Sequence, residues 1–421
     1  MNKIKKYLFS ELYEMSSGIS STKDQAGHGA PFLSFSTVFN NYFLPKELKD
    51  KMNTTSKEQE TFSIKKGDIF VTRTSETIDE LAMSCVALKD YPNATYSGFV
   101  KRIRPKTSGI VDDKFIAFYL RSKLFRKTME NNATMTLRAS FNEDIFSFLS
   151  LYLPPYKEQV KIGKLLYSIE EKIQYNKKIN DNLEQQAKLI YDYWFTQFDF
   201  PDENGKPYFS SGGKMVWNEQ LKRNIPENWA VVPLSTVFNF KSGFPFSSDL
   251  YVTKGRYKLL TIKNVQDNGI NFDVDNHIND IPSNVPDYCF LKANDILMSL
   301  TGNVGRIGIM YDDGCLLNQR VALAKPVNED LNSFVYFILK SDMIRKQYET
   351  IANGSSQKNL SPVEAENVLI AYNEQVAKHF ASFANKYLKT IVSNLLENES
   401  LIHLRDWLLP MLMNGQATIA D

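Results

Sequence analysis

The residue types that most often carry chemistry are scattered along the 421-residue chain. Cys85, Cys289 and Cys315 are odd in number, lie far apart and never form a C-x-x-C pair. This spacing argues against a disulfide framework or a zinc site, so we expect three buried, free cysteines. The histidines form no H-x-x-x-H pair and no ligand cluster: His28, His277, His379 and His403. We therefore predict no metal site in this chain.

Two short clusters have residue types found in enzymes. Pro154-Pro155-Tyr156 resembles part of the (Asn/Asp)-Pro-Pro-Tyr loop of amino-methyltransferases, whose first side chain accepts a hydrogen bond from the target amine. Leu153 stands at that place and cannot accept one. Asp202, Glu203 and Lys206 suggest a metal-dependent nuclease, but all three fall within one turn. Because a nuclease site draws its acids from separate strands, we interpret this cluster as a solvated connector.

Nucleotide-binding loops are also missing from the sequence. Gly302, Gly305 and Gly308 lack the G-x-G-x-x-G spacing, and no helical pattern follows them. The chain contains no G-x-x-x-x-G-K-[ST] phosphate loop either. We therefore predict a chain with no catalytic residue and no cofactor of its own, which acts by binding.

Composition predicts a globular protein with several cores. The chain is 43% hydrophobic and 23% charged, and its net charge is only +2. With so little excess charge, any nucleic-acid surface must be local. Basic residues gather in two short segments: Lys3, Lys5 and Lys6, and then Lys101, Arg102, Arg104 and Lys106. No apolar run approaches the ~18 residues of a membrane span, and a signal peptide pattern is absent, so we expect a cytoplasmic protein.

The same sequence pattern occurs twice in the chain. Corresponding pairs keep their order: Ser17-Gly18 with Ser242-Gly243, Gly67-Asp68-Ile69 with Asn294-Asp295-Ile296, and Glu158-Gln159-Val160 with Glu374-Gln375-Val376. Each copy has a strand-rich body, a short helical pattern and a long helical pattern. A preserved order with a slowly changing offset is typical of duplication followed by loop changes.

The two long helical patterns carry apolar positions at alternating steps of four and three, which predicts a coiled-coil pair. The first seam is Ile162, Leu166, Ile169, Ile173, Asn176, Asn180, Leu183, Ala187, Ile190 and Trp194. The second is Val376, Phe380, Phe383, Tyr387, Thr390, Asn394, Glu397, Leu401, Leu404, Leu408 and Met411. We expect Asn176 or Asn180 to face Asn394 and fix the register of an antiparallel pair. Two ordinary amphipathic helices on separate domains are the alternative.

These patterns predict an α+β fold. Two pseudo-symmetric α/β bodies are separated by two long antiparallel coiled-coil helices, each roughly 57 Å long at 1.5 Å per residue. The predicted boundaries are a first body at 1–153, a central helix at 154–197, a connector at 198–228, a second body at 229–370 and a C-terminal helix at 371–421.

Several short motifs resemble the specificity subunits of type I restriction-modification systems. The clearest is Leu153-Pro154-Pro155-Tyr156-Lys157-Glu158-Gln159 at the start of the first long helix; the second copy keeps only Glu374-Gln375. The others are Trp229 to Leu234, Gly67 to Phe70, Asn294 to Leu297, Gly302 to Gly305 and Ser356 to Leu360. The first copy departs from the family by having Ser75-Glu76-Thr77 in place of the glycine turn.

This resemblance implies a protein that reads a bipartite double-stranded DNA target. The bodies at 1–153 and 229–370 would be target-recognition domains, each reading one half. The helices would set the spacer and dock two methyltransferase subunits, whose chemistry is adenine methylation with S-adenosylmethionine. A further restriction and motor subunit would use ATP and magnesium.

Loop residues with guanidinium, amide, hydroxyl and ammonium groups are the candidates for DNA contact, because these groups read base edges and grip phosphates. They are Arg73, Thr74, Lys101, Arg102, Arg138, Ser140, Arg306, Gln319, Arg320, Ser356, Gln357, Lys358 and Asn359. The alternative function is a non-catalytic coiled-coil scaffold that bridges two proteins without reading DNA. The content of these loops favours DNA reading.

Overall fold

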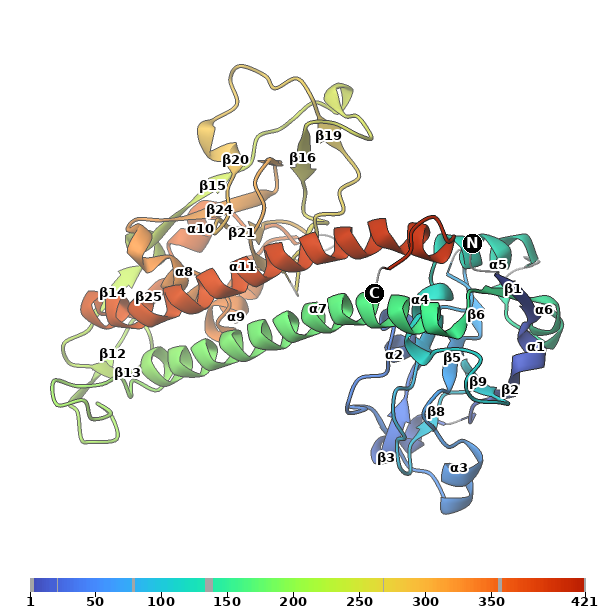
Figure 1. Ribbon diagram of the computed structural model, residues 1–421. Coiled ribbons are helices and arrows are strands. Elements are labelled where there is room, and N and C mark those ends of the chain that lie inside the picture. Colours follow the sequence, from blue (N-terminus) through green and yellow to red (C-terminus); the bar gives the residue numbers. More distant parts are fainter. Residues whose placement is uncertain are drawn as a thin grey trace. The chain divides into compact units, whose positions relative to one another are not determined.

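A computed structural model describes residues 4–20, 22–77, 80–132, 139–267, 269–354 and 358–419 (Figure 1). The chain divides into two compact units. Unit 1 comprises Met1–Ile173 and Ser400–Asp421, and unit 2 comprises Gln174–Glu399. Each long helix therefore contributes residues to both units.

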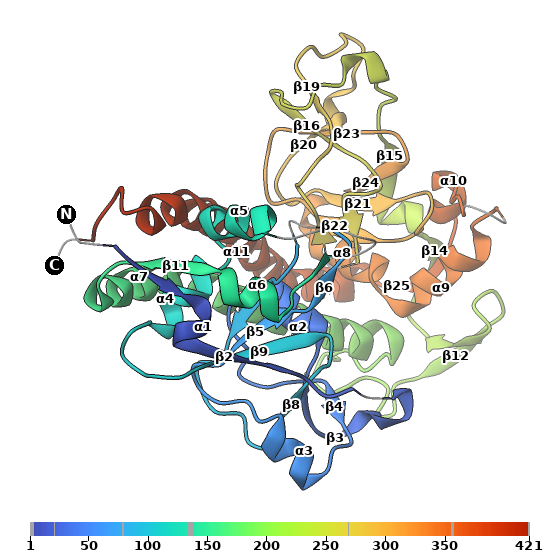
Figure 2. The ribbon, with the colours of Figure 1, turned by 90° about the vertical axis from the view of Figure 1, so that its right-hand side faces the viewer.

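Unit 1 is built around an antiparallel sheet in the order β2-β9-β5-β7, whose first three strands lie side by side in Figure 2. These strands are β2 (Tyr13–Ser17), β9 (Val100–Pro105), β5 (Ile69–Thr72) and β7 (Ser84–Val86). The smaller strands are β3 (Ala26–Leu33), β4 (Lys51–Met52) and β8 (Thr95–Tyr96), and β1 (Lys5–Leu8) with its partner β11 (Ser150–Leu153). The helices are α1 (Phe9–Leu12), α2 (Phe35–Asn40), α3 (Ser56–Thr61), α4 (Asp113–Tyr119), α5 (Lys123–Asn132) and α6 (Glu143–Phe148).

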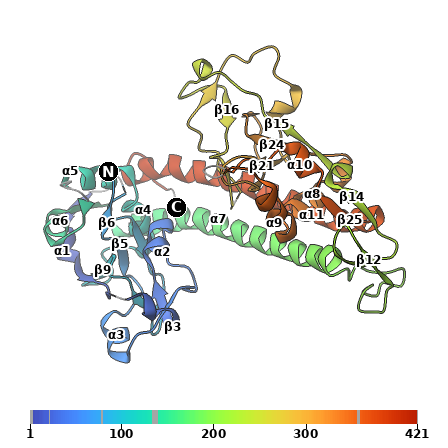
Figure 3. The ribbon, with the colours of Figure 1, turned by 180° about the vertical axis from the view of Figure 1, so that it is seen from behind.

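Unit 2 has a second antiparallel sheet, in the order β15-β24-β21-β22 (Figure 3). Its strands are β15 (Phe238–Ser242), β24 (Val321–Pro326), β21 (Ile296–Ser299) and β22 (Ile307–Ile309). The other strands include β16 (Tyr257–Leu260), β19 (His277–Ile278), β20 (Phe290–Leu291) and β23 (Cys315–Leu317), and β14 (Ala230–Pro233) paired with β25 (Leu369–Tyr372). The helices are α8 (Asn332–Leu339), α9 (Asp342–Ile351) and α10 (Pro362–Glu366).

The two units share one topology, so the predicted duplication is confirmed. The sheets β2-β9-β5-β7 and β15-β24-β21-β22 arrange their strands in the same order along the chain, and in each unit a second sheet contains one parallel pair, β3 with β8 and β16 with β23. Gly18 and Gly243 stand at the same place in the two copies. A Cβ on Gly18 would lie 2.1 Å from the Ser97 carbonyl oxygen, and one on Gly243 would lie 2.1 Å from that of Asn318. Each copy therefore needs glycine where the chain leaves the first strand of its sheet.

The long helices α7 (Tyr156–Tyr191) and α11 (Glu374–Met413) run antiparallel in both units. In unit 2, Asn176 donates to Asn398 at 3.0 Å, while in the π-helical turn that continues α7, Asp192–Thr196, the Trp194 ring lies 6.2 Å from that of Phe380. In unit 1, Arg405 donates to the Glu170 carboxylate at 2.8 Å. Contacts thus move toward lower numbers on α11 as they move toward higher numbers on α7, which confirms the predicted antiparallel pairing.

The seam predicted for α7 is confirmed, and that for α11 is confirmed in part: Phe380 is buried and Asn394 meets Asn180, but three predicted positions face solvent. On α7 every seam position is buried or half-buried. On α11 the predicted Thr390, Glu397 and Leu404 are exposed. The residue after each predicted position is also buried or half-buried, so the contact face is wider than the predicted seam: Ala377, Ala381, Ala384, Leu388, Ile391, Leu395, Asn398, Ile402, Arg405, Leu409 and Leu412. Phe383 and Tyr387 of the predicted seam are half-buried, and the Phe383 ring lies 5.7 Å from that of Trp194.

The stretch predicted as an irregular connector contains a hairpin, β12 (Met215–Asn218) with β13 (Arg223–Pro226). Its first residues belong to the core of unit 2, where Phe198 and Phe200 pack against Trp229. All three cysteines are free and buried, as predicted. Over the described ranges, every helix is too short or too polar to cross a membrane.

Candidate functional site

In unit 1, backbone pairing at the end of β5 brings several predicted residues together. Ser140 on β10 (Ala139–Ser140) lies opposite Thr74 on β6 (Thr74–Ser75). The Arg73 amide donates to the Phe99 carbonyl at 2.9 Å, and the Phe141 amide donates to the Arg73 carbonyl at 2.8 Å. Arg73 and Ser140 are exposed and Thr74 is half-buried. With Phe99 and Lys101 they form what we call surface 1: Arg73, Thr74, Phe99, Lys101 and Ser140.

Surface 1 contains a pair of repelling cations. Lys101 donates to the Ser17 hydroxyl at 2.8 Å. Partial burial lowers the pKa of Lys101 below that of an ordinary lysine, and the nearby charge of Arg73 lowers it further, while Glu143 opposes both. A bound phosphate would relieve this repulsion, because an anion favours the charged form of both groups. The arrangement therefore suits a site for an anionic backbone.

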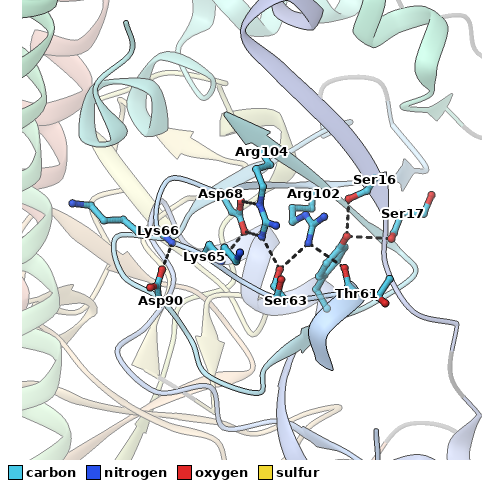
Figure 4. Close-up of polar contacts among 11 residues, drawn as sticks. Ser16, Ser17, Thr61, Ser63, Lys65, Lys66, Asp68, Asp90, Arg102 and Arg104 are labelled. Carbon is cyan, nitrogen blue, oxygen red and sulfur yellow. Dashed lines mark hydrogen bonds and ion pairs between the residues drawn. The ribbon is translucent and has the colours of Figure 1, made fainter. Parts of the chain in front are cut away.

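Arg102 points away from surface 1, so its placement differs from what the basic segment suggested. Side chains alternate along a strand, and Arg102 is 8% exposed on the opposite face from Lys101. Its guanidinium donates to the Ser63 carbonyl at 2.8 Å and lies over the Tyr96 ring (Figure 4). The guanidinium of Arg102 is thus engaged by groups of the protein itself, and we do not propose Arg102 as a DNA contact.

Arg104 is also occupied within unit 1. It donates to both carboxylate oxygens of Asp68, at 2.7 and 2.6 Å, and to the Ser63 carbonyl at 2.9 Å (Figure 4). Asp68 in turn accepts from the Lys65 amide at 2.7 Å. This ion pair ties β9 to the turn before β5. The run of basic residues in the sequence is therefore mainly a structural network.

The corresponding place in unit 2 has the same backbone pairing. The Leu300 amide donates to the Arg320 carbonyl at 2.9 Å, as Arg73 does to Phe99. Thr301 and Asn359 form a bridge like that of Thr74 and Ser140, and the Thr301 hydroxyl donates to the Asn359 amide oxygen at 2.8 Å. We call this region surface 2; its residues are Thr301, Arg306, Gln319, Arg320, Lys358 and Asn359.

Surface 2 presents its cations differently. Arg320 is exposed and adopts a φ of 71°, a left-handed conformation, in the turn between β23 and β24. Arg306 is half-buried and forms an ion pair of 3.1 Å with Asp267. Lys358 donates to the Glu349 carbonyl at 3.0 Å, and Gln319 is exposed. The predicted residues Arg138, Ser356 and Gln357 lie outside the described residues.

Sequence reasoning missed Phe99, whose side chain is 68% exposed. An apolar ring was not among the groups sought for DNA contact. The repeat holds a signal that could have found it, because Phe99 precedes β9 as Arg320 precedes β24. Pairing the two copies residue by residue would have marked the position.

Buried polar contacts connect the two helices. Asn394 donates to the Asn180 amide oxygen at 2.8 Å, and Asn180 donates to the Ile391 carbonyl at 3.2 Å. Asn176 meets Asn398 and also donates to Glu397 at 2.7 Å. Asn180 thus lies opposite Asn394, as predicted. Asn398 also belongs to these polar layers; sequence reasoning missed it because it placed Glu397 in the seam.

The acidic cluster of the connector has a local structural use. The Asp202 carboxylate accepts from the backbone amides of Asn204 and Lys206, each at 2.8 Å. Across the described ranges, no group of three or more His, Cys, Asp or Glu side chains is arranged to hold a metal ion. Leu153 is buried on β11.

Comparison with known proteins finds one family along most of the chain. The model of the type I restriction modification DNA specificity domain matches twice, at residues 9–185 and 226–396. The MjaIX specificity subunit of a type I restriction enzyme from Methanocaldococcus jannaschii is 22% identical over 80% of this chain and 76% of its own length. The HindI specificity subunit from Haemophilus influenzae is 22% identical over 91% of this chain and 94% of its own length.

A solved structure has a similar fold. The S subunit of a type I restriction-modification system from M. genitalium superposes with a TM-score of 0.61 at 16% identity. The match covers 98% of this chain and 96% of that one.

Proposed function

The chain belongs to the type I restriction modification DNA specificity family, and from this premise we propose how its two units divide the reading of one DNA target. As a member of this family, it is a sequence-specific DNA-recognition subunit. We assign one half of a bipartite target to each unit, so that the bodies at 1–153 and 229–370 are separate target-recognition domains. The observation that carries this proposal is a shared backbone turn that displays Phe99 in one copy and Arg320 in the other.

The proposed DNA contacts follow from surfaces 1 and 2. In unit 1 they are Arg73, Thr74, Lys101 and Ser140. Arg138, which lies outside the described residues, is proposed from the sequence alone. In unit 2 they are Arg306, Gln319, Arg320, Lys358 and Asn359. Ser356 and Gln357, which lie outside the described residues, are proposed from the sequence alone. Arginine and lysine read guanine edges and amide groups read adenine edges, while arginine, lysine and hydroxyl groups also hold phosphates.

We further propose that α7 and α11 set the spacer between the half-sites. Both helices continue from one unit into the other, and within unit 2 buried asparagine layers join them; such layers fix register. The helices would also dock two methyltransferase subunits. Exposed apolar side chains on them support this role: Tyr175, Ile179, Leu396, Leu404 and Trp407.

The partners would carry the chemistry. S-adenosylmethionine and adenine methylation belong to the methyltransferase subunits, and ATP and magnesium to a restriction subunit, within the cytoplasm. The scaffold alternative predicts no preference among DNA sequences. Methylome sequencing of a host with and without this gene tests the two: we expect one bipartite methylated motif that disappears with the gene. An unchanged methylome would contradict DNA reading.

A second experiment tests the spacer. Deleting one heptad from each helix, 176–182 and 392–398, removes both asparagine layers together and shortens the pair by about 10 Å at 1.5 Å per residue. The spacer in the methylated motif should shorten by roughly three base pairs, while both half-site sequences persist. The control replaces the same heptads with others of equal length and pattern, which should leave the spacer unchanged. If the deletion left the spacer unchanged, the helices would not set it.

A further inference from the structure

Phe99 is the exposed aromatic ring of surface 1. Its side chain is 68% exposed, although phenylalanines are usually buried. Its backbone is fixed on both sides: the Phe99 amide donates to the Ser97 hydroxyl at 3.2 Å, and its carbonyl accepts from Arg73 at 2.9 Å. The Val100 amide closes the turn on the Ser97 carbonyl at 2.9 Å. The ring is thus held outward by a short, hydrogen-bonded turn.

The surroundings of this ring are cationic. Arg73 pairs with Phe99 across the strands, and Lys101 lies two residues along, on the same face. Arg73 is close enough to lower the pKa of Lys101. An apolar ring between two cations suits DNA, where phosphates flank the bases and thymine carries a methyl group on its major-groove edge.

We propose that Phe99 contacts a thymine methyl group in the half-site read by unit 1. This inference rests on the proposed function and adds a specificity-determining residue to it. The C5-methyl group of thymine is the apolar feature of the major groove, and phenylalanine is among the side chains that contact it. Insertion between stacked bases is less favoured, since unstacking costs a few kcal/mol per step. The position of Phe99 in unit 2 is taken by Arg320, which matches a different base.

The test uses the full chain with its methyltransferase partner and a duplex carrying the methylated motif. Phe99→Ala should weaken binding to this duplex by about 10-fold to 100-fold and leave binding to an unrelated duplex unchanged. Its salt dependence should stay the same, because no phosphate contact is lost. Phe148→Ala is the matched control, since Phe148 is 74% exposed in the same unit. It should bind both duplexes like the wild type.

Uracil substitution identifies the contacted group. Each thymine of the first half-site is replaced in turn by uracil, which removes only the methyl group. One replacement should weaken binding by the wild-type protein and leave binding by the Phe99→Ala variant unchanged. If Phe99→Ala binds the motif normally, or if no uracil replacement is coupled to it, the inference is wrong. A wild-type complex that fails to distinguish the motif from the unrelated duplex would instead contradict the proposed function.

Discussion

Surfaces 1 and 2 share a backbone but differ in the side chains it displays. In unit 1 the paired residues are Arg73 and Phe99, both exposed. In unit 2 they are Leu300, which is 5% exposed, and Arg320, which is exposed. The cation and the apolar group have exchanged strands, and in unit 2 the apolar group has joined the core. A duplicated fold can therefore display different chemistry at the same place through substitutions at one pair of positions.

The supports of the two bodies differ as well. In unit 1, Arg121 donates to four backbone carbonyls and lies 4.9 Å from the Tyr42 ring, which Arg405 of α11 also approaches, at 5.0 Å. In unit 2, Glu184 of α7 pairs with Lys340 and accepts from the Tyr336 hydroxyl. Each body is thus attached to a long helix by its own polar cluster. This independence favours separate reading by the two units.

Exchange of one body is the strongest way to break the comparison. Replacing residues 1–153 with those of another family member should change one half of the methylated motif and leave the other unchanged. The expected effect is large, since specific binding exceeds non-specific binding by about 10³- to 10⁷-fold. Methylome sequencing of the host reads both halves at once. A simultaneous change of both half-sites would show that the units do not read independently.

The duplication, the class of fold and the buried positions of α7 could be predicted from the sequence, because it retains the order of the repeated motifs and the period of the apolar residues. The full width of the buried face of α11 could not. Phe380, Phe383 and Tyr387 suggested a narrow seam, but tertiary packing also buried Ala377, Ala381 and Ala384 beside them and left Thr390 exposed. Arg102 shows a second limit, since a basic run on a strand alternates between two faces. Which face meets solvent depends on partners such as Ser63, far along the chain from the strand.

Arg320→Ala sharpens the contrast between the surfaces. We expect binding of the motif to weaken by about 1–3 kcal/mol, with relaxed specificity at one position of the second half-site only. Binding to duplexes of varied sequence measures both effects. Lys222→Ala is the control, because Lys222 is 73% exposed in the connector. A uniform loss over all sequences would identify Arg320 as a phosphate contact instead.

The helix pair should respond differently from either surface. Asn180→Leu leaves Asn394 without its buried acceptor, so thermal unfolding should show a loss of about 1–3 kcal/mol. The double variant Asn180→Leu with Asn394→Leu should recover this loss, since an apolar layer costs less than a half-satisfied polar one. The methylated motif and its spacer should stay the same in both variants. If the stability losses of the single variants Asn180→Leu and Asn394→Leu simply added up in the double variant, the asparagines would not form a coupled layer.

The smallest expected effect concerns the cations of surface 1. Lys101 has a lowered pKa, first from burial and then from Arg73, so its charge is lost at a lower pH than that of an ordinary lysine. Because the unfolded chain keeps this proton to a higher pH, the contribution of Lys101 to stability rises as pH increases through its folded pKa. Arg73→Gln removes the repulsion and should raise the pKa of Lys101, while burial keeps it below the ordinary value. A ¹³Cε titration, with the resonance assigned by its absence in Lys101→Arg, measures the change. Glu349→Gln, in unit 2, should leave the titration unaltered. A Lys101 pKa that does not move in Arg73→Gln would mean that the two cations do not interact, and the anion site on surface 1 would lose its electrostatic basis.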